Sequence, residues 1–147
     1  MTQPSLFGGE TRGGSAIANI DGGSRGNPGP AGYGVRIEQP DGTITELKEF
    51  LGSCTNNVAE YSGLLAALRW AAEHGIAALR IRSDSELLVK QMRGEYRVKN
   101  PGLLPLYDEA RALMRSISKV TFEHVGREFN KDADRLANEA MDEGASS

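Results

Sequence analysis

The sequence contains little cysteine and little histidine, and this scarcity excludes several kinds of site. Cys54 is the one cysteine among 147 residues, so neither an intramolecular disulfide nor a cysteine-based zinc site can form. The two histidines, His74 and His124, are too few for a metal site made of histidine alone. No apolar run approaches the ~18 residues of a membrane-spanning helix, and the N-terminus lacks the charged-then-apolar pattern of a secretion signal. We therefore expect a soluble protein of the reducing cytoplasm that has no membrane partner.

An overall excess of positive charge is also absent. The chain has 17 lysines and arginines against 20 acidic residues, which gives a formal charge of −3 and an isoelectric point of about 5.4. This balance argues against a surface that is basic throughout, although it leaves room for a local basic patch. With 39% hydrophobic and 25% charged residues, the composition is typical of one globular domain with a sizeable core.

The pattern along the chain predicts one α/β domain at residues 16–141. Residues 1–15 are rich in glycine, serine and threonine and predict a disordered tail, and residues 142–147 predict a short C-terminal tail. Alternating segments predict strands at residues 16–21, 33–39, 43–51, 78–83 and 120–125. Helical periodicity predicts helices at residues 58–74, 85–92, 103–116 and 131–141. This order favours a mixed sheet with helices on its faces.

Two local patterns refine this interpretation. Ten of the 18 glycines lie within residues 1–34, so the segment 22–34 is expected to form a tight loop followed by a close-packed strand. Asn57 and Glu60 have the spacing of a capping box, which predicts the start of the first helix at Val58. Trp70 falls among the apolar residues of that helix, and we expect it to pack in the core.

Four acidic residues fall at the ends of predicted strands or in the first turns of predicted helices: Asp21, Glu60, Asp84 and Asp134. Each of them alone could simply make a favourable electrostatic interaction with a helix dipole. Parallel strands would bring them together at one edge of the sheet, where unpaired carboxylates repel one another. A divalent cation with oxygen ligands, Mg²⁺ or Mn²⁺, would remove that repulsion. The joint placement therefore favours a metal site.

The same acids lie within four ordered motifs, which read DGGSRGNPGPAGYG at 21–34, TNNVAEY at 55–61, SDS at 83–85 and NKDADRLAN at 130–138. From Ile17 to Met141 the chain resembles type 1 ribonuclease H. The resemblance implies a ribonuclease H-like fold, with a five-stranded mixed sheet of three antiparallel and then two parallel strands, flanked by helices. It also implies an endoribonuclease that hydrolyses the RNA strand of RNA–DNA hybrids and leaves 5′-phosphate and 3′-hydroxyl ends.

The resemblance assigns the four acids to two bound ions, Mg²⁺ or Mn²⁺. Asp21 would bridge both ions, and Asp134 would complete the site that activates water. Glu60 and Asp84 would complete the site that stabilises the leaving 3′ oxygen. Asp132 competes with Asp134 as a ligand, but the surrounding sequence ADRLA favours Asp134.

The resemblance also implies a set of substrate-binding residues: Gly22, Gly23, Ser24, Asn27, Thr55, Asn56 and Asn57. Backbone amides of the glycine-rich segment, with Asn27, would lie close to ribose, whose 2′-hydroxyl distinguishes RNA from DNA. Thr55 and Asn56 would hold a phosphate of the DNA strand where free N–H groups at a helix start favour anions. The alternative for Asn56 and Asn57 is that they only cap the helix.

The chain departs from the family pattern in the loop before the last carboxylate, where many members carry a histidine. His124 alternates with Val120 and Phe122, which predicts a place within a strand. The loop at 125–130 contains no histidine and resembles the shorter loop of archaeal-like members. There Arg127 would hold the phosphate, and Glu128 would exchange protons or attract metal. We favour Arg127 over His124.

The chain also has no room for the basic helix that some relatives insert after the second helix. Residues 80–99 nevertheless carry an excess of three positive charges. We expect Arg93, Arg97 and Lys99 to bind phosphates, and the alternative is that they form an ordinary solvated surface.

Two alternative functions stay open at this point. One is a non-catalytic hybrid-binding module, although clustered acids beside phosphate favour catalysis. The other is a different metal nuclease of the same superfamily, such as an exonuclease or a resolvase. The asparagine-rich motifs favour ribonuclease H. We expect a monomer whose partner is an RNA–DNA hybrid, with double-stranded RNA as a candidate secondary substrate.

Overall fold

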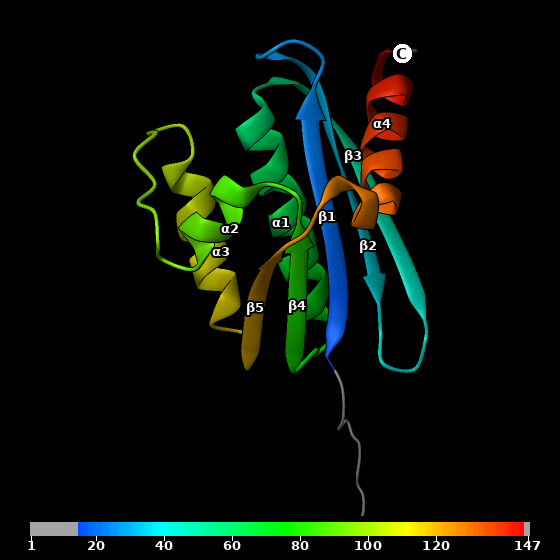
Figure 1. Cartoon of the computed structure of the whole chain (residues 1–147), viewed down its shortest axis with the longest axis vertical. Helices are drawn as coiled ribbons and strands as arrows, with labels where there is room; N and C mark the ends of the chain where they lie inside the picture. Colours follow the sequence, from blue (N-terminus) through cyan, green and yellow to red (C-terminus); the bar gives the residue numbers. More distant parts are fainter. Residues whose placement is uncertain (1–14, 146–147) are drawn as a thin grey trace, which may run out of the picture.

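The computed structural model describes residues 15–145 and contains a five-stranded mixed sheet with helices on both faces (Figure 1). The expected N-terminal tail therefore lies outside the described residues except for Ser15. The strands are β1 (Ala16–Ser24), β2 (Gly29–Glu38), β3 (Ile44–Cys54), β4 (Ala78–Ser83) and β5 (Lys119–His124). The helices are α1 (Asn56–Glu73), α2 (Glu86–Met92), α3 (Leu104–Met114) and α4 (Lys131–Ala145), with a short 3₁₀ helix, η1, at Arg127–Phe129.

The strand order is β3-β2-β1-β4-β5, with β1 at the centre. The first three strands pair antiparallel, and β1, β4 and β5 pair in parallel. The predicted α/β class, the order of elements and the five-stranded mixed sheet are thus confirmed. Because β1 and β4 are parallel, their carboxyl ends meet at one edge of the sheet, as the site prediction required.

The glycine-rich segment differs from the expected loop. β1 continues to Ser24 and β2 begins at Gly29, so only residues 25–28 form the turn. Gly22 and Gly34 pair within the ladder, opposite Tyr33 and Asp21 respectively. The prediction was wrong because these glycines serve close packing of the strands against helices, which chain-local turn preferences do not report.

The start of α1 also differs from the prediction. Thr55 is the N-cap, and its hydroxyl oxygen accepts a hydrogen bond from the backbone N–H of Val58 at 3.2 Å. The helix therefore begins at Asn56, two residues earlier than expected, and the capping box of Asn57 and Glu60 is not formed.

α1 fills the core on one face of the sheet. Its apolar positions include Tyr61, Leu64 and Leu68, which are at most 1% exposed. Trp70 is 9% exposed and stacks on His74 with ring centroids 4.2 Å apart, so it packs as expected. No helix among the described residues has both the length and the apolar character needed to cross a membrane.

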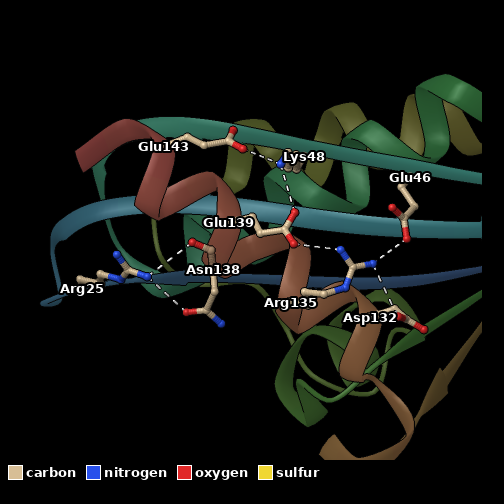
Figure 2. A network of polar contacts seen from close by, with 8 residues as sticks. All are labelled: Arg25, Glu46, Lys48, Asp132, Arg135, Asn138, Glu139 and Glu143. Atoms are coloured by element: carbon tan, nitrogen blue, oxygen red, sulfur yellow. Dashed lines mark hydrogen bonds and ion pairs between the residues drawn. The ribbon is translucent and has the colours of Figure 1, made fainter. Parts of the chain in front are cut away.

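α4 packs on the opposite face and is longer than predicted. It continues four residues past Met141, so part of the expected C-terminal tail, 142–145, is helical. Polar contacts tie its outer side to the neighbouring strands (Figure 2). Lys48 on β3 contacts Glu139 and Glu143 at 3.1 and 2.6 Å, and Arg135 contacts Glu46 at 2.7 Å. The contact of Lys48 with Glu143, together with an ion pair between Arg25 and Asp142 at 2.7 Å, supports the helix beyond Met141.

Candidate active site

A cleft of about 420 Å³ opens where β1 and β4 end. It is lined by Asp21, Gly22, Asn56, Asn57, Glu60, Asp84, Ser85, Arg127 and Asp134. All four acids singled out in the sequence line this cleft. They come from four different elements or junctions. Asp134 lies in the first turn of α4 and Asp84 in the link from β4 to α2. Asp21 lies within β1, three residues before its end, and Glu60 is the fifth residue of α1, so neither the expected strand end nor the expected first turn is correct for them.

Two glycines allow the helices to approach the strand that carries Asp21. A side chain on Gly22 would place its Cβ 2.4 Å from the backbone of Ala59, next to Glu60. A side chain on Gly34, which pairs with Asp21, would place its Cβ 2.4 Å from the carbonyl oxygen of Ala133. Both distances are too short for a real contact, so glycine at these positions lets α1 and α4 bring their acids to β1. This is a structural role for Gly22 beside the expected substrate contact, and the role of Gly34 was missed in the sequence.

Asp21 is at the electrostatic centre of the cleft. The pKa of its carboxyl is raised from 3.8 to about 8, first by burial and then by the negative charges of Asp84 and Asp134 and a side-chain hydrogen bond with Asp134. The backbone N–H of Gly22 opposes this shift. A raised pKa with these causes means that Asp21 is crowded by like charges and favours a positive partner.

Glu60 is perturbed in the same direction. Burial raises its pKa from 4.5 to about 7, and the charge of Asp84 adds to the increase. Ser85 opposes it by a side-chain hydrogen bond to the carboxylate. Ser85 is also the N-cap of α2, and its Oγ accepts from the N–H of Leu88 at 3.3 Å. Its contact with Glu60 was missed, although it follows Asp84 directly in the SDS motif.

The chemistry of these groups fits a divalent cation. Within residues 15–145, no three carboxylate, imidazole or thiol groups already converge as metal ligands. The mutual effects on the pKa of Asp21 nevertheless identify Asp84 and Asp134 as its close neighbours. All of these donors are oxygen atoms, which suits a hard ion, and a cation among them would offset the repulsion that raises the pKa of Asp21.

The substrate-binding candidates are connected to one another by hydrogen bonds. The side-chain oxygen of Asn56 accepts from the backbone N–H of Ser24 at 2.7 Å and from its hydroxyl at 3.1 Å. The side-chain oxygen of Asn27 accepts from the backbone N–H of Asn56 at 3.1 Å. The β1–β2 turn is thus fixed to the start of α1. Asn56 and Asn57 line the cleft, whereas Thr55 caps the helix.

The loop before α4 places only one of its candidate residues in the cleft. Arg127, in η1, is a lining residue, whereas Glu128 and His124 are not. His124 is the last residue of β5 and pairs with Ser83. Asp132 lies outside the cleft and contacts Arg36 and Arg135, both at 3.6 Å. The geometry thus favours Arg127 over His124, and Asp134 over Asp132.

The basic residues within 80–99, which we call the basic strip, mostly make contacts within the protein. Arg93 donates two hydrogen bonds to the carbonyl oxygen of Phe122, at 2.7 and 3.1 Å. Arg80 and Arg82 contact Glu123 at 3.1 and 3.3 Å. Arg97 and Lys99 are exposed in the connection between α2 and α3, and they are the strip residues best placed to meet solvent or a ligand.

Comparison with known proteins relates this chain to a family. Residues 19–140 match a family described as reverse transcriptase-like. The bifunctional protein Rv2228c of Mycobacterium tuberculosis is 47% identical over 89% of this chain, and this chain spans only 36% of its length. Ribonuclease HI of Halobacterium salinarum is 42% identical over 90% of this chain and 67% of its own length.

Solved structures agree with these relatives. The N-terminal ribonuclease H domain of Rv2228c has a TM-score of 0.86 and 47% identity, covering 90% of this chain and 96% of that one. LC11 ribonuclease H1, solved in complex with an RNA/DNA hybrid, has a TM-score of 0.84 and 39% identity, covering 89% of this chain and 99% of that one. Enzymes of this family use divalent metal ions. The fold, the acid-lined cleft and these relatives together show that the chain belongs to the type 1 ribonuclease H family of enzymes.

Proposed function

We propose that the chain hydrolyses the RNA strand of RNA–DNA hybrids and uses two Mg²⁺ or Mn²⁺ ions in the acid-lined cleft. The observation that carries the proposal is the convergence of four carboxylates on one cleft, with the pKa of Asp21 raised to about 8 by burial and by its acidic neighbours. A module that only binds nucleic acid has no need to gather negative charge where phosphates must lie. A solved relative, LC11 ribonuclease H1, is described in complex with an RNA/DNA hybrid.

The residues of the cleft would divide the work between holding ions and holding substrate. Asp21, whose acidic neighbours are Asp84 and Asp134, would hold both ions. Asp134 would complete one ion site, and Glu60 and Asp84 would complete the other. Bound divalent ions supply Lewis-acid activation of a water molecule and stabilise the leaving oxygen.

Substrate contacts would come from the rim of the same cleft. Asn56 and Asn57 line it beside the start of α1 and would approach the nucleic-acid backbone. The hydrogen bonds of Asn56 to Ser24 and Asn27 hold this part of the rim in one arrangement before substrate arrives, which lowers the ordering cost of binding. Arg127, in the loop before α4, lines the same cleft and would hold a phosphate oxygen.

A cleavage assay on short labelled duplexes tests the proposal. Wild-type protein and Asp21→Asn are incubated with a hybrid, double-stranded RNA and double-stranded DNA, each with Mg²⁺ and with EDTA. We expect cleavage of the RNA strand of the hybrid only with the cation and only by wild type, with 5′-phosphate and 3′-hydroxyl ends. Binding without cleavage would support the binding module instead, and equal cleavage of DNA would favour another nuclease of the superfamily.

The sequence also supports three further proposals. They are activity on double-stranded RNA, a monomeric state and a cytoplasmic location. The double-stranded RNA arm of the same assay and sedimentation of the purified protein test the first two.

A further inference from the structure

Two buried asparagine side chains contact each other where β1 meets the start of α4. Asn19 is 9% exposed and Asn130 is 1% exposed. Among residues 15–145 they belong to a group of only four buried polar residues, the others being Ser83 and Gln91. We refer to Asn19 and Asn130 as the asparagine pair.

The pair joins segments that are more than a hundred residues apart in the chain. The side-chain N–H of Asn130 donates to the carbonyl oxygen of Ile20 at 2.9 Å. The side-chain N–H groups of Asn19 donate to the side-chain oxygen of Asn130 at 3.0 Å and to the carbonyl oxygen of Phe129 at 3.1 Å. Each of these bonds lies between β1 and the residues directly before α4.

Both ends of this link lead directly to cleft residues. Ile20 precedes Asp21 in β1. The backbone oxygen of Asn130 accepts from the N–H of Asp134 at 3.1 Å, and its backbone N–H donates to the carbonyl of Arg127 at 2.9 Å. The asparagine pair therefore connects the backbone beside Asp21 to the two cleft residues contributed by the loop and α4.

The two sides of the link are not equally rigid. β1 is held by ladders to β2 on one side and β4 on the other. α4 is held on the sheet from Ala133 onward, by the close approach of Gly34 to the Ala133 carbonyl and by buried Leu136 and Met141. Within the described chain, residues 127–132, which form η1 and the first residues of α4, belong to no strand ladder. Loss of the pair should therefore release these segments and leave the sheet and the rest of α4 in place.

We propose that the asparagine pair is a positioning element that sets the place of Asp134 relative to Asp21 and so determines how tightly the cleft holds divalent cations. This inference rests on the proposed function. Polar groups behind metal ligands typically change metal affinity by about 10- to 100-fold when they are removed. Because the pair acts through the backbone, we expect the lower end of that range.

The test is a Mn²⁺ titration of the protein without nucleic acid, followed by the electron paramagnetic resonance signal of free Mn²⁺. Asn130→Ala is expected to weaken binding about 10-fold. Asn19→Ala should weaken it less, because the bond from Asn130 to Ile20 remains. In hybrid cleavage, kcat should fall with little change in KM, because the rim at Asn56 and Asn57 does not depend on the pair.

A control variant separates positioning from general loss of stability. Ile37 is fully buried in β2 and pairs with Ala18, three residues before Asp21 in β1. Ile37→Ala should lower the free energy of unfolding without changing the affinity for Mn²⁺. If Asn130→Ala keeps wild-type affinity, or if Ile37→Ala loses as much affinity at equal loss of stability, the inference is overturned. Should Asn130→Ala fail to fold, Asn130→Ser and Asn19→Ala decide the question by the same comparison.

A double-mutant cycle identifies the residue through which the pair acts. In an Asp134→Ala background, Asn130→Ala should reduce the remaining affinity for Mn²⁺ by no more than about twofold. A persistent 10-fold loss there would overturn the role assigned to Asp134. If wild-type protein binds Mn²⁺ but does not cleave hybrid, the proposed function fails, while the titrations still decide whether the pair positions the cleft.

Discussion

Replacing Asp21 by asparagine should stabilise the metal-free protein at neutral and alkaline pH. The pKa of Asp21 is raised from 3.8 to about 8 in the folded protein. Between these values the folded state keeps a proton that the unfolded chain releases, so the free energy of unfolding falls as the pH rises from about 4 to about 8. Below pH 4 both states are protonated and the penalty is absent. An asparagine side chain cannot ionise, so the Asp21→Asn variant avoids this fall in the free energy of unfolding.

The size of this change in stability follows from the shift in the pKa of Asp21. A difference of about four pKa units corresponds to about 6 kcal/mol if every atom stays in place. Asp134 is exposed and lies in the first turn of α4, so small movements can separate it from Asp21 and relieve part of the repulsion. We therefore expect Asp21→Asn to be more stable than wild type by about 2 kcal/mol at pH 8 in EDTA.

Urea unfolding at pH 4, 6 and 8 measures this difference directly. Asp41→Asn is a suitable control, since Asp41 lies in the exposed β2–β3 turn and its pKa is lowered by hydrogen bonds from Thr43. Its replacement should bring no gain in stability at pH 8. Adding Mg²⁺ should stabilise wild type more than Asp21→Asn. A stability difference that does not change with pH, or a variant less stable than wild type at pH 8 in EDTA, would refute the reasoning.

Three further predictions concern packing, chemistry and substrate binding. Gly34→Ala should destabilise the protein by about 2 kcal/mol in thermal unfolding, because its Cβ would lie 2.4 Å from a backbone oxygen of α4; unchanged stability would contradict the close approach. Arg127→Ala should lower kcat on hybrid at least 10-fold while His124→Ala stays near wild type, since only Arg127 lines the cleft. The opposite ranking would favour His124 as the functional residue. The double replacement of Arg97 and Lys99 by alanine should reduce the salt dependence of hybrid binding by about one to two units of slope, and an unchanged slope would exclude them as phosphate contacts.

The motif residues fall into two groups, those that line the cleft and those that hold the lining elements together. Gly22 and Gly34 act by leaving space for the backbones of α1 and α4. Thr55 ends the extended chain and starts α1, so that Asn56 and Asn57 lie on the rim. A motif residue can therefore shape the cleft without lining it.

The sequence by itself determined the class of fold and the acids of the site. The apolar spacing of α1 reports burial on one face, and this periodicity is a property of neighbouring residues along the chain. Asp21, Glu60, Asp84 and Asp134 stood out because each was expected where a strand ends or a helix begins, although Asp21 lies within β1 and Glu60 is the fifth residue of α1. These features are local, so they can be identified before the chain is folded.

Only the tertiary structure decided which groups face one another. The glycine-rich segment was expected to be a tight loop followed by a close-packed strand, but most of it pairs in the β1–β2 ladder, and its glycines leave space for α1 and α4. Arg93 was expected to face phosphate, but its guanidinium is hydrogen-bonded to the carbonyl of Phe122. Asn19 and Asn130 meet across 111 positions of the chain. Such pairings depend on register and on the packing of distant elements. Local propensity and periodicity do not report either of these.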